Sequence, residues 1–173
     1  MIKVSINEIP TEKDWMEVKK RALVTIGKKA VNPPDLEWKK AMLKARHSPI
    51  RRLFFSFYIE RPYWVSVHLS RHIHAQPYIK SQRNDRQNEY DRNDAPQSQM
   101  VSMIWDMNGE ELMTIANKRL CKKASKETRE VVRKICDLVI EAMPEYKGLL
   151  VPMCVHNGGI CYEINSCKEK FDD

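Results

Sequence analysis

The chain has 173 residues, of which 42% are hydrophobic, enough apolar material for one domain, over residues 1–173, with a buried core. Its charged content of 31%, the lack of an apolar run that could span a bilayer and the lack of a signal-peptide core in residues 1–15 argue against membrane and secreted classes. We therefore expect a cytoplasmic protein whose five cysteines are reduced thiols. The net charge of +7 suits anionic partners such as nucleotides, nucleic acids or phosphorylated metabolites.

The first half of the chain predicts two strands and two helices. Alternating apolar residues over 2–6 indicate a short strand, and a helix with a cap at Thr11 follows to about Lys28. A second helix is expected over 36–46, ending before the proline at position 49. The aromatic run 53–60 is typical of a strand. The residues of the first helix that we expect to face inward are Trp15, Val18, Ala22 and Ile26.

The middle of the chain predicts one amphipathic helix and one long loop. The helix begins at Pro62 and ends before Pro77, with two separate stripes along its length. One stripe holds Trp64, His68, Arg71, His72 and Ala75, and the other holds Val65, Leu69 and Ile73. Residues 80–99 are almost wholly polar and predict a loop whose length suggests a function or disorder.

The last third predicts a strand, two helices and a final strand. The strand covers 101–105, and Asn108 with Glu111 begins a helix that runs to about Cys121. Ser125 begins the next helix, which runs to Met143. The residues expected to face inward on it are Val131, Val132, Ile135, Leu138, Val139 and Ala142. Residues 149–155 are the last strand candidate.

The stretch 71–86 is either a solvated basic segment or a wall that holds an anion. Arg71 and His72 can simply stabilise the negative C-terminal end of a helix. Arg119 and Arg129 can likewise be ordinary exposed helix residues. Residues 80–92 are basic enough to suggest nucleic-acid binding, but the acidic residues among them weaken that hypothesis.

Two histidine and cysteine groups have to be weighed as metal sites. His68 and His72 lie one helical turn apart with His74 nearby, but no carboxylate or cysteine at suitable spacing completes a ligand set. The tail offers the group Cys154, His156, Cys161 and Cys167. Its spacings are not those of a common zinc ribbon or finger, so we expect free thiols and no metal.

Four segments, taken in order, resemble the flavin-dependent thymidylate synthase family. Family members carry a His-Thr/Ser-Pro segment before an aromatic strand, and residues 47–49 fit it. They then carry Arg-His-Arg-x-x-Ser-x-Asn-Glu-x-Ser-x-Arg, and the frame here retains Arg71, His72, Ser81 and Arg83. A later arginine precedes Ala-Gln-x-Glu-Ile-Arg. The residues that match this motif are Arg119, Ala124, Glu127 and Arg129.

The resemblance covers roughly residues 1–145, leaves 146–173 outside and includes several departures. Ile73 replaces the second arginine of the first motif, Gln76 replaces its first serine, and Tyr78 and Ile79 replace its Asn-Glu pair. His68 stands where the family usually has glutamine. In the later motif, Ser125 and Thr128 replace glutamine and isoleucine. An arginine that the family usually supplies between the two motifs is not evident, and the short chain would fit a phage-like origin.

The resemblance implies an α/β (α+β) fold with a central, mostly antiparallel sheet packed against long helices. It implies reductive methylation of dUMP to dTMP, with methylenetetrahydrofolate as carbon donor, reduced FAD as hydride donor and NADPH as a further co-substrate. By the same resemblance, Ser81 and Arg129 are catalytic, and His68, Ser81, Arg83 and Arg129 bind the substrate. The FAD-binding residues it implies are His47, Ser48, Arg71, His72 and Arg119. A homotetramer is also implied, with sites assembled from several subunits.

Two further hypotheses stay open beside this enzyme. The first is a nucleotide-binding or altered-activity member of the same fold, which keeps Ser81, Arg83 and Arg129 but has lost flavin chemistry through the changes at Ile73 and Ile79. The second is a basic nucleic-acid binder that uses residues 80–92. Flavin retention separates the enzyme from the binding module, and salt-dependent oligonucleotide binding would single out the last.

Overall fold

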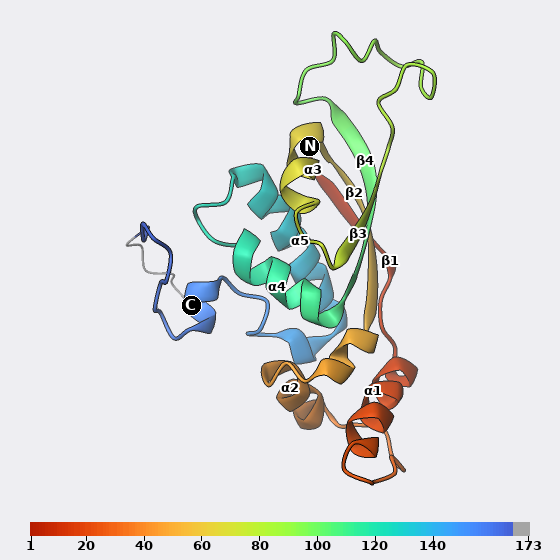
Figure 1. Cartoon of the computed structure of the whole chain (residues 1–173), viewed down its shortest axis with the longest axis vertical. Coiled ribbons are helices and arrows are strands. Elements are labelled where there is room, and N and C mark those ends of the chain that lie inside the picture. Colours follow the sequence, from red (N-terminus) through yellow and green to blue (C-terminus); the bar gives the residue numbers. More distant parts are fainter. Residues whose placement is uncertain (168–173) are drawn as a thin grey trace.

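The computed structural model describes residues 1–167, which contain both strands and helices (Figure 1). The four strands are β1 Lys3–Glu8, β2 Phe54–Pro62, β3 Ala75–Ile79 and β4 Met100–Asn108. The α-helices are α1 Glu12–Val24, α2 Leu36–Lys44, α3 Tyr63–Leu69, α4 Gly109–Arg119, α5 Lys126–Ala142 and α6 Met153–His156. Two short 3-10 helices, η1 Ser48–Arg52 and η2 Pro144–Tyr146, complete the described part. None of its helices is long and apolar enough to cross a membrane.

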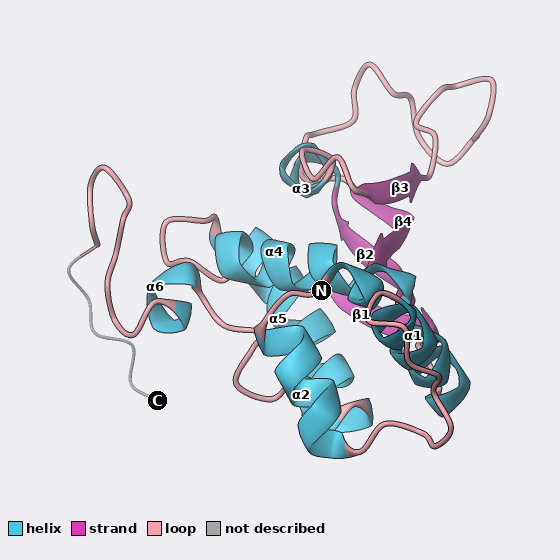
Figure 2. Ribbon diagram, turned by 60° about the horizontal axis from the view of Figure 1, so that its bottom comes forward, coloured by secondary structure: helices cyan, strands magenta, loops and turns pink. Residues whose placement is uncertain are grey.

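The four strands form one antiparallel sheet in the order β1-β2-β4-β3, which confirms the α+β class with a mainly antiparallel sheet. Side chains alternate between its two faces, so Phe55, Phe57 and Ile59 of β2 are buried on the same side as Met103 and Trp105 of β4. Helices α4 and α5 lie together on that side (Figure 2). The hydrophobic core of the described residues therefore lies between the sheet and these helices, and it extends to α1 and α2 through Trp15, Val18, Met42 and Leu43.

Helix α5 confirms the predicted amphipathic pattern over most of its length. Its N-cap is Ser125, whose side chain accepts a hydrogen bond from the amide of Thr128. The core side of α5 buries Val131, Val132, Ile135 and Val139. Ala142 was expected there and is exposed, because the helix ends at that residue and the chain turns into η2.

The helix predicted from Pro62 to Pro77 is much shorter in the structure. Helix α3 ends at Leu69, and two tight turns lead to β3, which pairs with β4. The backbone of residues 75–79 thus forms hydrogen bonds with β4, which it could not form if the helix continued through these residues. Ile73, which the helical pattern put on one stripe with Val65 and Leu69, falls in the turn and is 85% exposed, whereas those two residues are buried.

Two other expectations were wrong at the ends of the chain. Ile26 lies beyond the end of α1 and is 62% exposed. The strand predicted over 149–155 is not formed. The carbonyl of Val151 instead accepts a hydrogen bond of 2.7 Å from the Asn117 side chain, and Pro152 caps the short helix α6. This contact ties the segment to α4 instead of to a sheet edge.

The polar segment 80–99 is a long loop, as predicted, and extends past the end of the sheet between β3 and β4 (Figure 1). It contains its own hydrogen bonds. The Asn84 side chain donates to Asp91 at 3.0 Å and accepts from the amide of Arg92 at 2.8 Å. The Gln87 side chain accepts from the amides of Glu89 and Tyr90. These side-chain contacts replace the secondary structure that the loop lacks.

Gly109 generates the first prediction, because a methyl group there would enter occupied space at the first residue of α4. An added Cβ would lie 2.8 Å from the Tyr146 hydroxyl oxygen and 3.0 Å from the Ile50 carbonyl oxygen. We expect Gly109→Ala to lower the free energy of unfolding by about 1–3 kcal/mol, measured by urea denaturation, although alanine favours helices. The control is Lys126→Ala at the exposed first position of α5, with an expected change under about 0.5 kcal/mol. Equal stability of the two variants would contradict the prediction.

Candidate functional site

The imidazole of His72 is the centre of the candidate site. It is 8% exposed and packs edge-on against Trp105, at 6.2 Å between ring centroids. Its Nδ1 lies 3.2 Å from a carboxylate oxygen of Glu111, and its Nε2 accepts a hydrogen bond of 2.9 Å from Nε of Arg119. A guanidinium can only donate, so Nε2 carries no proton and the ring proton is on Nδ1, where it is donated to Glu111. The two contacts therefore hold one neutral tautomer of the ring.

Arg119 joins three elements at the C-terminal end of α4. Besides its contact with His72, its Nη2 donates to the carbonyl of His68 at 2.7 Å, which satisfies one of the last carbonyls of α3. Burial lowers the pKa of Arg119, and the like charge of Arg71 lowers it further. The guanidinium still stays charged at neutral pH because its ordinary pKa is so high.

His68 of α3 and Arg129 of α5 both make their contacts near the beginning of α5. The hydroxyl of Thr128 lies 3.0 Å from Nδ1 of His68 and accepts a hydrogen bond of 2.7 Å from Ser125. Nη1 of Arg129 donates to the carbonyls of Lys122 and Ala124, at 2.5 and 2.8 Å. Arg129 thereby holds the loop between α4 and α5, from which Cys121, Lys123 and Ala124 line a cavity beside His72.

The ring of His72 faces a basic cavity of about 290 Å³. The cavity is also lined by Lys118, Arg119 and Lys123, and its acidic lining residue is Glu163. Guanidinium and ammonium groups that converge on one space are suited to phosphate or carboxylate groups. The arrangement therefore favours an anionic ligand.

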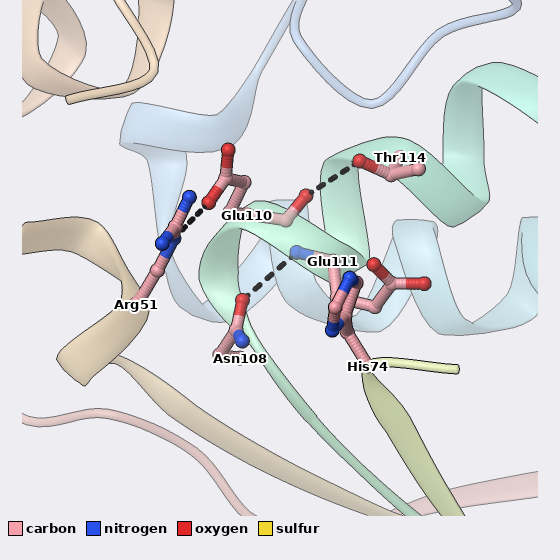
Figure 3. Close-up of a pocket in the computed structure, with 6 residues that line it drawn as sticks. All are labelled: Arg51, His74, Asn108, Glu110, Glu111 and Thr114. Atoms are coloured by element: carbon pink, nitrogen blue, oxygen red, sulfur yellow. Dashed lines mark hydrogen bonds and ion pairs between the residues drawn. The ribbon is translucent and has the colours of Figure 1, made fainter. Parts of the chain in front are cut away.

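Glu111 also lines a second cavity, of about 270 Å³ (Figure 3). Its other lining residues are Arg51, His74, Asn108, Glu110 and Thr114. Arg51 and Glu110 form an ion pair across it, so its charges are mixed rather than basic. Glu111 thus lines this second cavity and contacts His72, which lines the basic cavity, while its amide donates to the side chain of Asn108 at 2.9 Å.

The remaining predicted site residues lie elsewhere in the chain. His47 and Ser48 are exposed at the beginning of η1. Ser81 and Arg83 are exposed in the loop 80–99, where Arg83 makes two hydrogen bonds to Asp85, of 2.9 and 2.6 Å. Arg71 is exposed beside His72. Among residues 1–167, no hydrogen bond or ion pair connects the loop residues with the basic cavity.

Sequence reasoning missed two residues that organise the site. Glu111 was predicted only as a capping residue, and its burial and its contact with His72 are visible only in the structure. Arg46 has a φ of 50° and donates to the side chains of Thr114 and Asn117 of α4. No pattern in the sequence indicates that contact, because it joins residues far apart along the chain. In the described part of the chain, no group of three or more His, Cys, Asp or Glu side chains is arranged to hold a metal ion.

The buried carboxylate of Glu111 yields a stability prediction. Glu111→Ala leaves the Nδ1 proton of His72 buried without an acceptor, so we expect a loss of about 1–3 kcal/mol in the free energy of unfolding. Glu110→Ala, at the adjacent position, breaks only the partly exposed ion pair with Arg51 and should cost less than about 1 kcal/mol. Urea denaturation of both variants checks the difference, and a larger loss for Glu110→Ala would contradict the assigned contact.

Comparison with known proteins agrees with the resemblance found in the motifs. The family model described as thymidylate synthase complementing protein matches residues 84–145. The crystal structure of a UMP/dUMP methylase, PolB from Streptomyces cacaoi, bound with 5-Br dUMP, is similar with a TM-score of 0.69 and 15% identity. The match covers 87% of this chain and 97% of that chain. No curated protein matches. The chain thus has the fold of that methylase and resembles the flavin-dependent thymidylate synthase family, whose model matches residues 84–145.

Proposed function

We propose that this protein is a flavin-dependent thymidylate synthase-like enzyme that methylates dUMP to dTMP, with methylenetetrahydrofolate as carbon donor, reduced FAD as hydride donor and NADPH as co-substrate. One observation carries the proposal. The motif segments around His72 and Arg119 are almost fifty residues apart, yet their side chains meet at 2.9 Å beside a basic cavity. That convergence is what a shared ligand site requires, and independent surface residues would not produce it.

The basic cavity fits the diphosphate of FAD in charge. Lys118, Arg119 and Lys123 face it, and charge-assisted hydrogen bonds from such groups to phosphate oxygens are strong. In this proposal Arg119, Arg71 and His72 hold the cofactor, together with His47 and Ser48. The bound flavin supplies the hydride. The protein's own part is to orient the cofactor through groups held in place, because His72 cannot turn without losing both of its partners.

The nucleotide is proposed to bind through Ser81, Arg83, Arg129 and His68. A uracil ring that gains negative charge during the reaction needs a positioned cation, and Arg129 is anchored by two backbone carbonyls. Arg83 and Ser81 would take the phosphate once Arg83 exchanges Asp85 for it. Since these residues lie on the extended loop 80–99, we propose a homotetramer in which one chain's loop completes another chain's site.

A nucleotide-binding module without flavin chemistry is the second candidate. The exposure of Ile73 favours it, because the position that carries arginine in the family motif presents an apolar side chain to solvent here. Retention of flavin distinguishes the two candidates.

The first functional prediction is that purified protein retains FAD after the excess is removed, and that dUMP perturbs the visible absorbance spectrum of the bound flavin. Arg119→Ala should weaken retention roughly tenfold or more, since it removes one charged hydrogen-bond donor from the cavity and releases His72. Arg21→Ala, which removes an exposed charge on α1, is the control and should retain FAD like the wild type. Wild-type protein that holds no flavin with or without dUMP would favour the binding module.

The second functional prediction concerns Arg129. Arg129→Ala should weaken dUMP binding, measured by titration calorimetry, by roughly tenfold to a hundredfold, because a charged donor to the uracil is lost. Arg133→Ala removes an exposed arginine one helical turn further along α5 and should leave the affinity unchanged. Wild-type affinity in Arg129→Ala, with the fold intact by circular dichroism, would remove this residue from the nucleotide site under either candidate function.

A further inference from the structure

Three cysteines from two distant parts of the chain line one small cavity beside α4. Cys121 follows α4, Cys154 lies in α6, and Cys161 follows the turn after α6. Together they face a space of about 80 Å³ that Asn117 also lines. All three are partly exposed free thiols, so a small reagent can reach them.

The local backbone explains why Cys154 and Cys161 approach one another. Gly158 and Gly159 have φ values of 67° and 93°, a region that favours glycine, and the amide of Gly159 donates to the Cys154 carbonyl at 2.8 Å. The chain therefore reverses after α6 and returns Cys161 towards Cys154. The hydrogen bond from Asn117 to Val151 holds this reversed segment against α4.

The pKa values of Cys161 and Cys154 are shifted in opposite directions, as suits an attacking and a resolving cysteine. Hydrogen bonds from the backbone of Glu163 and from the Ser166 side chain lower the pKa of Cys161, so a larger fraction of this thiol is in the nucleophilic thiolate form. Burial raises the pKa of Cys154, and the nearby charges of Cys161 and then Cys121 raise it further. Cys136 is different, because burial in the core raises its pKa to about 12 and makes it inert.

We propose that Cys154 and Cys161 are a disulfide-forming pair that a small-molecule disulfide oxidises. The Cys161 thiolate attacks one sulfur of that disulfide, its S–S bond breaks, and one thiolate leaves. The Cys154 thiol then loses its proton and attacks the mixed disulfide at Cys161, which releases the second thiolate. The two cysteines lose two electrons in total, and the small molecule is reduced to two thiols.

The disulfide would close the turn 154–161 covalently and restrict the segment that follows it. Glu163 lines both the thiol cavity and the basic cavity beside His72. Oxidation therefore limits the positions open to Glu163, the acidic residue among those described at the basic cavity. The chemistry of the pair does not depend on the proposed function, because it involves no nucleotide or flavin.

The test uses the full chain, reduced and then incubated with oxidised glutathione, alkylated with N-ethylmaleimide and digested with trypsin. Trypsin leaves Cys154, Cys161 and Cys167 together in peptide 148–168 and Cys121 in peptide 120–122. We expect peptide 148–168 to lose two hydrogen atoms and to carry one alkyl group, on Cys167. A cross-link to peptide 120–122 would overturn the pairing.

Single variants separate the pair from general thiol oxidation. Cys154→Ser should stop at a stable glutathione adduct on Cys161, and Cys161→Ser should form neither a disulfide nor a rapid adduct. Cys167→Ser is the matched control, because Cys167 does not line the cavity, and it should form the disulfide like the wild type. If the wild type and Cys154→Ser yield the same glutathione adduct, Cys154 does not resolve it and the proposal is wrong.

Discussion

The site depends on two hydrogen bonds that hold the ring of His72 between the first and last turns of α4. Glu111 binds one ring nitrogen and Arg119 binds the other, so one helix sets the position and the tautomer of an imidazole that belongs to the turn before β3. Each partner would be costly to leave alone, because a buried donor or charge without a partner loses its hydration with no compensation. The positions of the turn after α3, of α4 and of the edge of the sheet therefore depend on one another through these two contacts.

The same contact decides where positive charge collects. Nε of Arg119 donates to His72, and its Nη2 donates to the carbonyl of His68. These contacts hold the charged guanidinium at the edge of the cavity, where Lys118 and Lys123 also lie. The charged residues of the loop 80–99 are exposed, and Lys80 and Arg83 pair with other residues of the loop instead of with the core. Arg83 is paired with Asp85 in an exposed position, and an exposed ion pair contributes little stability. A phosphate could replace Asp85 there at small cost, whereas replacing Glu111 at His72 would disturb the core.

Local signals in the sequence predicted most of the elements well. The cap residues Thr11, Asn108 and Ser125 located three helix starts, because each cap depends on residues at most three positions away. The prediction failed where a distant partner overrode the local pattern. Residues 75–79 form a strand because their backbone pairs with β4. Residues 149–155 lie beside α4 because the Asn117 side chain donates to the carbonyl of Val151.

By itself, the sequence determined the basic charge, the polar loop, the amphipathic α5 and the motif frame that carries the family resemblance, since all of these depend on composition and short spacing. It identified His72 and Arg119 as candidates but could not indicate that they touch. Only the tertiary structure decided that contact, the burial of Glu111 beside His72 and the placement of Cys121, Cys154 and Cys161 around one cavity. These depend on how helices and turns pack across long stretches of chain, and no spacing rule over a few residues contains that information.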